Sequence, residues 1–236
     1  MVIRQRAIQA VDKEERRHAI LDAAERMFIN YPDRLANVSE VADAAGLAKG
    51  TVYLYFPSKE ELLLALHERN SDRFFSVLIE RLELGEPVAI DDILAITHEH
   101  MVRSPTYLPL AGMCFGMMEK SISAEAATGF HERMAERLLR AGAGLERHFP
   151  RLKRGQGVML LMHSYGLIIG LWQLAQKGQE HELDPANRSL DVFRWDYATQ
   201  LDDALRALWA GSVEDGAGAA PARQTNAAVS ARSKRK

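Results

Sequence analysis

The sequence predicts an all-helical fold with a small N-terminal and a larger C-terminal domain, and three observations support it. Apolar residues recur at helical spacing through most of the chain, no run of alternating apolar and polar residues marks a strand, and β-branched residues are sparse. The 236 residues are 47% apolar and 26% charged, which is ordinary for a globular protein long enough to bury a real core.

The charge and cysteine content limit the kinds of site that the chain can carry. Its formal net charge is −2, so a binding site for a polyanion must be a local patch rather than a basic domain. The single cysteine, Cys114, excludes an intramolecular disulfide and suits a reducing cytoplasm. The N-terminal segment is too polar for a signal peptide, and we therefore expect a cytoplasmic protein.

The first predicted helix covers residues 14–30, where an apolar stripe repeats at helical spacing. The stripe consists of Ile20, Leu21, Ala24, Met27, Phe28 and Tyr31. Residues 1–13 precede it, and we expect them to form a flexible arm. The basic residues of this arm either stay solvated or reach nucleic-acid phosphates, and they are Arg4, Arg6 and Lys13.

Two capping signals and a glycine delimit the next helices. Asn37-Val-Ser-Glu40 has the spacing of a capping box and starts a second helix, which Gly46 ends at the position where a left-handed residue is usual. A short third helix follows over residues 48–56, and Pro57 prevents its continuation. Ser58-Lys59-Glu60-Glu61 repeats the capping-box spacing and opens a fourth helix.

Three such helices, the last two joined by a tight turn that contains glycine, predict a helix-turn-helix over residues 37–56. Val52 points toward the other helices, which leaves Thr51, Leu54 and Tyr55 on the opposite side of the short third helix. The second helix of such a pair can enter the DNA major groove, where threonine and apolar side chains contact thymine methyl groups. Contact with DNA thus explains the exposed aromatic and aliphatic side chains.

The segment RRHAILDAAERMFINY…VSEVADAAGLAKGTVYLYFPSKEELLLAL, about residues 14–66, resembles the DNA-binding domain of the TetR family of transcriptional regulators. The most diagnostic part is AGLAKGTVYLYFPSKEELL. The resemblance implies DNA contact at the following positions, with Leu54 added from the same outer face: Lys49, Gly50, Thr51, Tyr53, Leu54, Tyr55 and Lys59. Ala48 stands where many relatives have Ser or Thr, and Leu54 where many have His or Tyr, so the base preference cannot be transferred.

Two of these residues have alternative roles that the sequence leaves open. Tyr53 either packs beneath the third helix or places its hydroxyl on a phosphate. Lys59 either contacts a phosphate or is a solvated residue of the first turn of its helix. Thr51 and Tyr55 have no obvious place in the core, so DNA contact is favoured for both.

The C-terminal domain, residues 67–212, contains a long predicted helix over 124–148 and an uncharged stretch over 155–176. The uncharged stretch is long enough to span a membrane, and Gly166 and Gly170 form a GxxxG pair in it. Polar residues interrupt the stretch and no second apolar span follows. We therefore interpret it as a helix buried between two subunits rather than in a membrane.

A last helix is predicted over residues 189–210 from its apolar stripe. Together with the segment 155–177 it forms half of an intermolecular four-helix bundle in relatives of the TetR family, and the resemblance therefore implies a homodimer. Residues 213–236 have low complexity and a basic end, and we expect them to be a disordered tail.

Methionine-rich and aromatic residues of the C-terminal domain form the predicted effector site. They are Met113, Cys114, Met117, Met118, His163 and Trp172. Flexible, polarizable side chains suit the wall of an apolar cavity, and ordinary core packing explains them equally well. His163 is either a buried histidine with a satisfied partner or a hydrogen-bonding residue for a ligand.

Motifs for catalysis and metal binding are incomplete throughout the sequence. HERMA at 131 and HERNS at 67 each lack the second histidine of the HExxH zinc helix. GQGVML at 155 has two glycines where a dinucleotide-binding loop needs three, and no strand precedes it. We expect no catalytic residue, no metal and no cofactor.

These patterns predict a homodimeric transcriptional regulator, a repressor that a small effector releases from its operator. The N-terminal helices would read a palindromic double-stranded DNA site, and the C-terminal domain would bind an effector that the sequence does not identify. The alternative is a helical sensor or scaffold whose helix-turn-helix binds a protein partner.

Overall fold

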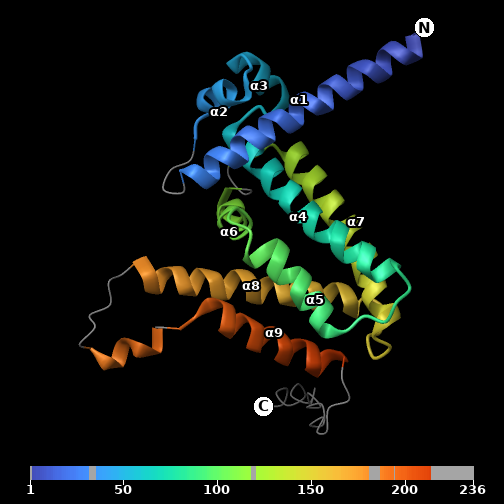
Figure 1. The fold of residues 1–236 in the computed structure, drawn as a ribbon, viewed down its shortest axis with the longest axis vertical. Helices are drawn as coiled ribbons and strands as arrows, with labels where there is room; N and C mark the ends of the chain where they lie inside the picture. The colour runs from blue at the N-terminus through green and yellow to red at the C-terminus, as the bar shows by residue number, and fades with distance from the viewer. Residues whose placement is uncertain (1, 32–35, 118–120, 181–186, 194, 214–236) are drawn as a thin grey trace, which may run out of the picture.

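The computed structural model describes residues 2–31, 36–117, 121–180, 187–193 and 195–213, and these residues form helices and connecting loops without strands (Figure 1). The predicted all-helical fold is confirmed. The elements are α1 (Val2–Asn30), α2 (Val38–Ala45), α3 (Lys49–Tyr55), α4 (Lys59–Glu83), α5 (Ile90–Thr97), a π-helical turn η1 (His98–Val102), α6 (Tyr107–Met117), α7 (Ala124–His148), α8 (Gln156–Glu180), a 3-10 turn η2 (Arg188–Phe193) and α9 (Tyr197–Val213).

Helices α1, α2 and α3 gather at one end of the molecule, and α8 and α9 lie side by side at the other end (Figure 1). The long helices α4 and α7 pack along each other between these ends. Because α4 contacts α1 as well as α5, α6 and α7, it belongs to both domains.

The predicted caps of α2 are present in the structure. The Asn37 side chain accepts a hydrogen bond from the Glu40 backbone N–H at 3.0 Å, and the Glu40 carboxylate accepts one from the Asn37 N–H at 2.9 Å. Gly46 ends the helix with φ of 68°, a left-handed conformation that strains residues with a side chain. The reciprocal capping thus fixes the start of α2, and the left-handed Gly46 forms the turn that separates α2 from α3.

The cap of α4 differs in one respect from the predicted box. Ser58 Oγ accepts a hydrogen bond from the Glu61 N–H at 3.0 Å, as expected. The Glu61 carboxylate instead accepts a hydrogen bond from the Ser123 N–H at 3.3 Å, at the start of α7. The first turn of α4 is thereby tied to the C-terminal domain.

Two boundaries differ from the prediction. α1 begins at Val2, so the segment expected to be a flexible arm is helical from that residue on, consistent with its lack of Gly and Pro. The predicted helix over 189–210 is divided into η2 and α9, because Asp196 caps a new start by accepting a hydrogen bond from the Thr199 N–H at 2.8 Å. The predicted tail, apart from Val213, lies outside the described residues.

Each domain has its own apolar cluster. The N-terminal cluster joins α1 to α4 through residues such as Ile20, Val52 and Leu66, all fully buried. The C-terminal cluster contains residues of every helix from α4 to α9. Leu110 of α6 belongs to the N-terminal cluster, whereas its neighbour Ala111 belongs to the C-terminal one, so α6 also contacts both domains.

Helices α7 and α8 cross in direct backbone contact. A Cβ atom added to Gly157 of α8 would lie 2.2 Å from the carbonyl oxygen of Gly142 of α7. Since this oxygen belongs to the backbone of a packed helix, it cannot move aside as a flexible side chain would. The crossing therefore requires glycine at position 157.

We expect Gly157→Ala to lower the free energy of unfolding by about 1–3 kcal/mol, because the added methyl group must force the two helices apart. Urea denaturation followed by circular dichroism measures this change. Gly50→Ala is the control: a Cβ there meets nothing within 4 Å, and the free energy should stay within about 0.5 kcal/mol. Equal stability of the two variants would contradict the backbone contact.

Candidate functional site

Helix α3 presents the most exposed apolar side chain of the N-terminal domain. Leu54 is 83% exposed and Tyr53 is 43% exposed. Lys49 is exposed on the preceding turn, and its ammonium group lies 6.0 Å from the centroid of the Tyr53 ring. Gly50 is also exposed, with open space around its Cα. This outer face combines a cation, an aromatic ring, an aliphatic side chain and accessible backbone.

Thr51 and Tyr55 do not point away from the domain as fully as the sequence suggested. Both are half-buried, and Tyr55 packs against the N-terminal apolar cluster. Tyr53 differs in the opposite direction. The sequence allowed it to pack beneath the helix, but the side chain is exposed. Lys59 is half-buried on the first turn of α4. The outermost residues are therefore Lys49, Tyr53 and Leu54.

Buried residues hold α3 against α1, α2 and α4. Val52 is fully buried and Phe56 is 3% exposed, so the inner side of the helix is fixed in the N-terminal cluster. Ala48 precedes the helix without a side-chain cap. A short helix held from one side and exposed on the other has a shape that the major groove of DNA admits.

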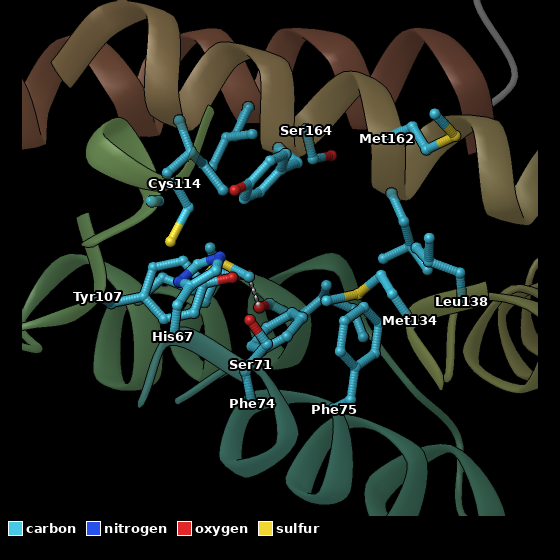
Figure 2. A pocket seen from close by; sticks show the side chains of 18 of the residues that line it. His67, Ser71, Phe74, Phe75, Tyr107, Cys114, Met134, Leu138, Met162 and Ser164 are labelled. Carbon is cyan, nitrogen blue, oxygen red and sulfur yellow. Dashed lines mark hydrogen bonds between the residues drawn. The ribbon is translucent and has the colours of Figure 1, made fainter. Parts of the chain in front are cut away.

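A cavity of about 320 Å³ lies in the C-terminal domain between α4 and α8 (Figure 2). Side chains of α4, among them Phe74 and Phe75, line one side, and Ser164 and Met162 of α8 lie opposite. The volume is at the lower end of the range for pockets that take drug-sized molecules. Most of the lining is aliphatic, aromatic or sulfur-containing.

A few polar groups lie together at one part of this wall. His67 is 4% exposed, and its Nδ1 atom has no hydrogen-bond partner within the protein. Its ring packs edge-on against Tyr107, with centroids 5.4 Å apart, and Ser71 follows one turn later on α4. Burial lowers the pKa of His67 to about 4, so the imidazole is neutral at physiological pH. For the Cys114 thiol, burial has the opposite effect: it raises the pKa to about 12, so the thiol stays protonated.

The structure brings one of the predicted effector residues, Cys114, to the cavity wall. Met113 packs against the N-terminal cluster instead, Trp172 lies against Gly112 of α6, and His163 is exposed. These three side chains do not line the cavity. Met118 and the side chain of Met117 lie outside the described residues.

Sequence reasoning missed the α4 side of the cavity. His67, Ser71 and Phe74 recur at i, i+4 and i+7, so they lie on one side of the helix. The available signal was the presence of two polar residues, His67 and Ser71, in a stripe otherwise formed by leucine and phenylalanine.

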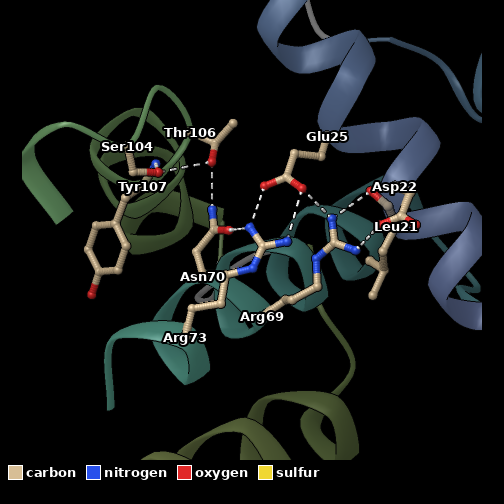
Figure 3. Close-up of polar contacts among 9 residues, drawn as sticks. All are labelled: Leu21, Asp22, Glu25, Arg69, Asn70, Arg73, Ser104, Thr106 and Tyr107. Carbon is tan, nitrogen blue, oxygen red and sulfur yellow. Dashed lines mark hydrogen bonds and ion pairs between the residues drawn. The ribbon is translucent and has the colours of Figure 1, made fainter. Parts of the chain in front are cut away.

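A group of ion pairs and hydrogen bonds joins α4 to α1 and to the loop before α6 (Figure 3). Arg69 donates to Asp22 at 2.6 Å, to Glu25 at 2.7 Å and to the Leu21 carbonyl at 3.0 Å. On the same helix, Asn70 donates to the Thr106 hydroxyl at 2.8 Å in a buried contact. The cavity-lining helix is thereby fixed to both of its neighbours.

Helix α4 is also joined to α7 by charge. Burial alone would raise the pKa of Glu68, but hydrogen bonds and the charges of Arg133 and Arg137 outweigh it, and the pKa is lowered. The Arg133 guanidinium donates to Glu68 at 2.8 Å. Glu68, the residue after His67 in the sequence, is therefore ionised, and its carboxylate is already paired with arginines of α7.

No group of three or more metal-ligating side chains occurs among the residues that the structure describes. One helical segment, Gln156–Gln176, is long and apolar enough to cross a membrane by length and composition. The core helix of a soluble protein passes the same test, so this segment is weak evidence for a membrane protein.

Comparisons with known proteins agree with the two-part architecture. Residues 20–66 match the model of the tetR family of bacterial regulatory proteins, and residues 68–215 match that of the Tetracyclin repressor-like C-terminal domain. The solved structure of SmeT, the repressor of the Stenotrophomonas maltophilia multidrug efflux pump SmeDEF, covers 85% of this chain with a TM-score of 0.53 and 21% identity. This alignment spans 91% of SmeT and supports the fold.

Two curated relatives resemble a shorter part of the chain. The HTH-type transcriptional activator FasR of Mycolicibacterium smegmatis is 39% identical over 64 residues, which are 27% of this chain and 29% of the relative. The fatty acid metabolism regulator protein of Bacillus subtilis is also 39% identical over 64 residues, 27% of this chain and 31% of the relative. The chain thus matches less than a third of the length of either protein.

We expect the buried neutral His67 to make the protein sensitive to acid. Its pKa is lowered from 6.5 to about 4 in the native state, so the unfolded chain binds a proton in this pH range that the native chain does not. Stability from this source is present above pH 6.5 and is lost as the pH falls toward 4. Between pH 7 and pH 5, the free energy of unfolding of His67→Phe should fall by about 2 kcal/mol less than that of the wild type.

Urea denaturation at constant protein concentration and a series of pH values measures this difference. His18→Phe provides the matched control, because His18 is exposed on α1 and its replacement removes no buried imidazole. Identical profiles for His67→Phe and the wild type would show that His67 is not held neutral.

Proposed function

This chain belongs to the tetR family of bacterial regulatory proteins, and we propose that it is a transcriptional regulator that binds a DNA operator through α3 and responds to a small molecule in the cavity. The observation that carries the proposal is the exposed outer face of α3 within a segment that matches the family model. Nothing in the matches favours the alternative of a protein-binding scaffold.

The proposed assembly is a homodimer through α8 and α9. Met159, Met162 and Leu174 of α8 are each about half exposed, at 47%, 51% and 59%. Gly166 and Gly170 have open space where a Cβ would lie, so a second helix can approach closely there. An exposed apolar helix face of this kind is typical of a subunit interface. Homodimers are also typical of the family.

Such a dimer would place two copies of α3 about 34–36 Å apart, one turn of DNA, and would require a palindromic site. The proposed mode of regulation is repression: an effector in the cavity favours a different spacing of the two copies and so weakens binding to DNA. For this to occur, the effector must have unequal affinity for the two conformations. Helices α4 and α6 support this coupling because each contacts both the cavity and the N-terminal cluster.

The proposed cellular setting is the cytoplasm, and we propose no catalytic activity, because members of the family are transcriptional regulators. The curated relative FasR is named an activator and the structural neighbour SmeT a repressor, so the direction of regulation differs among similar proteins. The proposal of repression rests on the coupling described above and not on either name.

We expect Leu54→Ala to weaken operator binding about tenfold while leaving stability unchanged, because this side chain is exposed in the free protein. The operator is obtained by selecting duplexes from a random library with the full chain, and affinity is measured by fluorescence anisotropy at fixed salt. Leu54 is preferred to Tyr55 because Tyr55 packs on the core, where truncation would also change stability.

Leu84→Ala is the matched control for this experiment. Leu84 is 60% exposed at the end of α4 and lies outside the helix-turn-helix, so its truncation should not change the affinity. Failure to select any duplex would refute DNA binding, and selection of non-palindromic duplexes alone would refute the proposed palindromic site. Wild-type affinity of Leu54→Ala for a selected duplex would refute the contact by this residue.

We expect Leu174→Glu to convert the dimer to monomers, because a carboxylate on each side of the interface would be buried without a partner. Sedimentation velocity at several protein concentrations measures the distribution. Leu139→Glu is the control, since Leu139 on α7 is 63% exposed and lies outside the proposed interface. Equal dimerisation of both variants would contradict the assignment of the interface to α8.

A further inference from the structure

The described lining of the cavity contains no permanently charged side chain, since it includes no Asp, Glu, Lys or Arg. Its exposed histidine, His131, uses Nδ1 in a hydrogen bond with the Ala127 carbonyl at 2.7 Å. Glu68, the carboxylate nearest in sequence to His67, is ion-paired with Arg133 and Arg137 of α7. An ionised group entering the cavity would therefore lose its water without gaining an opposite charge, which is strongly unfavourable.

Most of the polar groups in the lining already have partners inside the protein. The Ser164 hydroxyl donates to the Leu160 carbonyl at 2.8 Å and accepts from the Trp209 indole N–H at 3.0 Å. The Thr97 hydroxyl donates to the Ile93 carbonyl at 2.8 Å. These groups are satisfied by their own helices and by each other, so they present little hydrogen-bonding capacity to a ligand.

Two neighbouring groups of the wall are exceptions, Ser71 Oγ and His67 Nδ1, because neither atom has a hydrogen-bond partner in the protein. The His67 side chain is almost completely buried. A buried polar atom without a hydrogen bond is destabilising, and in native proteins it usually has a ligand or an ordered water as partner. His67 also lies beside Tyr107 and one turn before Ser71, so the most polar part of the wall surrounds it (Figure 2).

The protonation state of His67 decides which kind of polar group it can bind. With a pKa of about 4, protonation at pH 7 is about a thousandfold unfavourable, so the residue does not provide a cation for a carboxylate. A neutral imidazole carries one donor and one acceptor nitrogen. A hydroxyl group, which both donates and accepts, can therefore pair with Nδ1 in either tautomer.

We propose that the effector is an uncharged molecule with an apolar chain and a hydroxyl or carbonyl oxygen that hydrogen-bonds to His67. This inference rests on the proposed function only in treating the cavity as the effector site. An uncharged effector excludes free fatty acids and amines as direct ligands of the cavity. One relative is nevertheless named as a regulator of fatty acid metabolism.

The size of the cavity indicates the length of the chain. A volume of about 320 Å³ is at the lower end of the range for small-molecule pockets, so a probe with one chain of medium length is appropriate. 1-Decanol is such a probe. Decanoate and decylamine have chains of the same length with a negative and a positive group, and decane lacks the polar group.

Isothermal titration calorimetry of the full chain at pH 7.5, without DNA, tests the proposal with these four probes. We expect 1-decanol to bind at least tenfold more tightly than decanoate or decylamine, because only its polar group is uncharged. The proposal is overturned if decanoate or decylamine binds as tightly as 1-decanol. It is also overturned if 1-decanol shows no binding up to its solubility limit.

Variants of His67 test its role separately. In His67→Phe the affinity for 1-decanol should fall about three- to tenfold, as expected for one lost hydrogen bond, whereas the affinity for decane should not fall. His67→Gln retains a donor and an acceptor and should bind 1-decanol more tightly than His67→Phe does. His18→Phe is the control, because His18 is exposed on α1 outside the cavity and its replacement should leave both affinities unchanged.

An equal loss of affinity for decane and 1-decanol in His67→Phe would assign His67 a packing role and refute the hydrogen bond. Circular dichroism of each variant establishes that it is folded, and the four-probe comparison on the wild type does not depend on any variant. Failure of the proposed DNA binding is distinguished from failure of this inference, since the titrations contain no DNA and the anisotropy experiment contains no probe.

Discussion

The arrangement of this molecule depends on one constraint: α4 is a continuous helix of 25 residues that is buried in both domains. Its first turns place Leu62 and Leu66 in the N-terminal cluster, and its later turns place Phe74 and Leu78 in the C-terminal one. The intervening residue His67 faces the cavity. The α3 surface and the cavity are therefore supported by the same helix.

Two further contacts strengthen this dependence. The ion pairs of Arg69 with Asp22 and Glu25 fix α1 to α4 on the side opposite the cavity, and they are partly buried, so solvent screens them less than ordinary surface pairs. Leu110 of α6 inserts into the N-terminal cluster, while Cys114 of the same helix lines the cavity. A molecule that displaces α6 therefore also displaces the support beneath the helix-turn-helix.

The sequence was sufficient at several positions where local signals determine the structure, although the local cap at Asp196 was missed. The Asn37 cap, the left-handed Gly46 and both ends of the helix over 124–148 were predicted correctly, because hydrogen bonds and dihedral preferences within a few residues decide them. The cavity required contacts between helices distant in sequence. His67 on α4 and Tyr107 on α6 become neighbours only through packing, and the half-burial of Tyr55 depends on the cluster beneath it. For the same reason, Met113 and His163 suggested a site that does not coincide with the cavity.

The glycine crossing of α7 and α8 has a consequence for the shape of the cavity. The two helices touch at Gly142 and Gly157, and the lining residues lie progressively farther from that contact, at Leu138 and Met134 on α7 and at Leu161 and Tyr165 on α8. Two helices that cross in backbone contact at one point diverge from it, so the gap between them widens with distance from the contact. On the side lined by these two helices, the cavity is therefore widest toward the exposed His131 and narrowest beside the glycines.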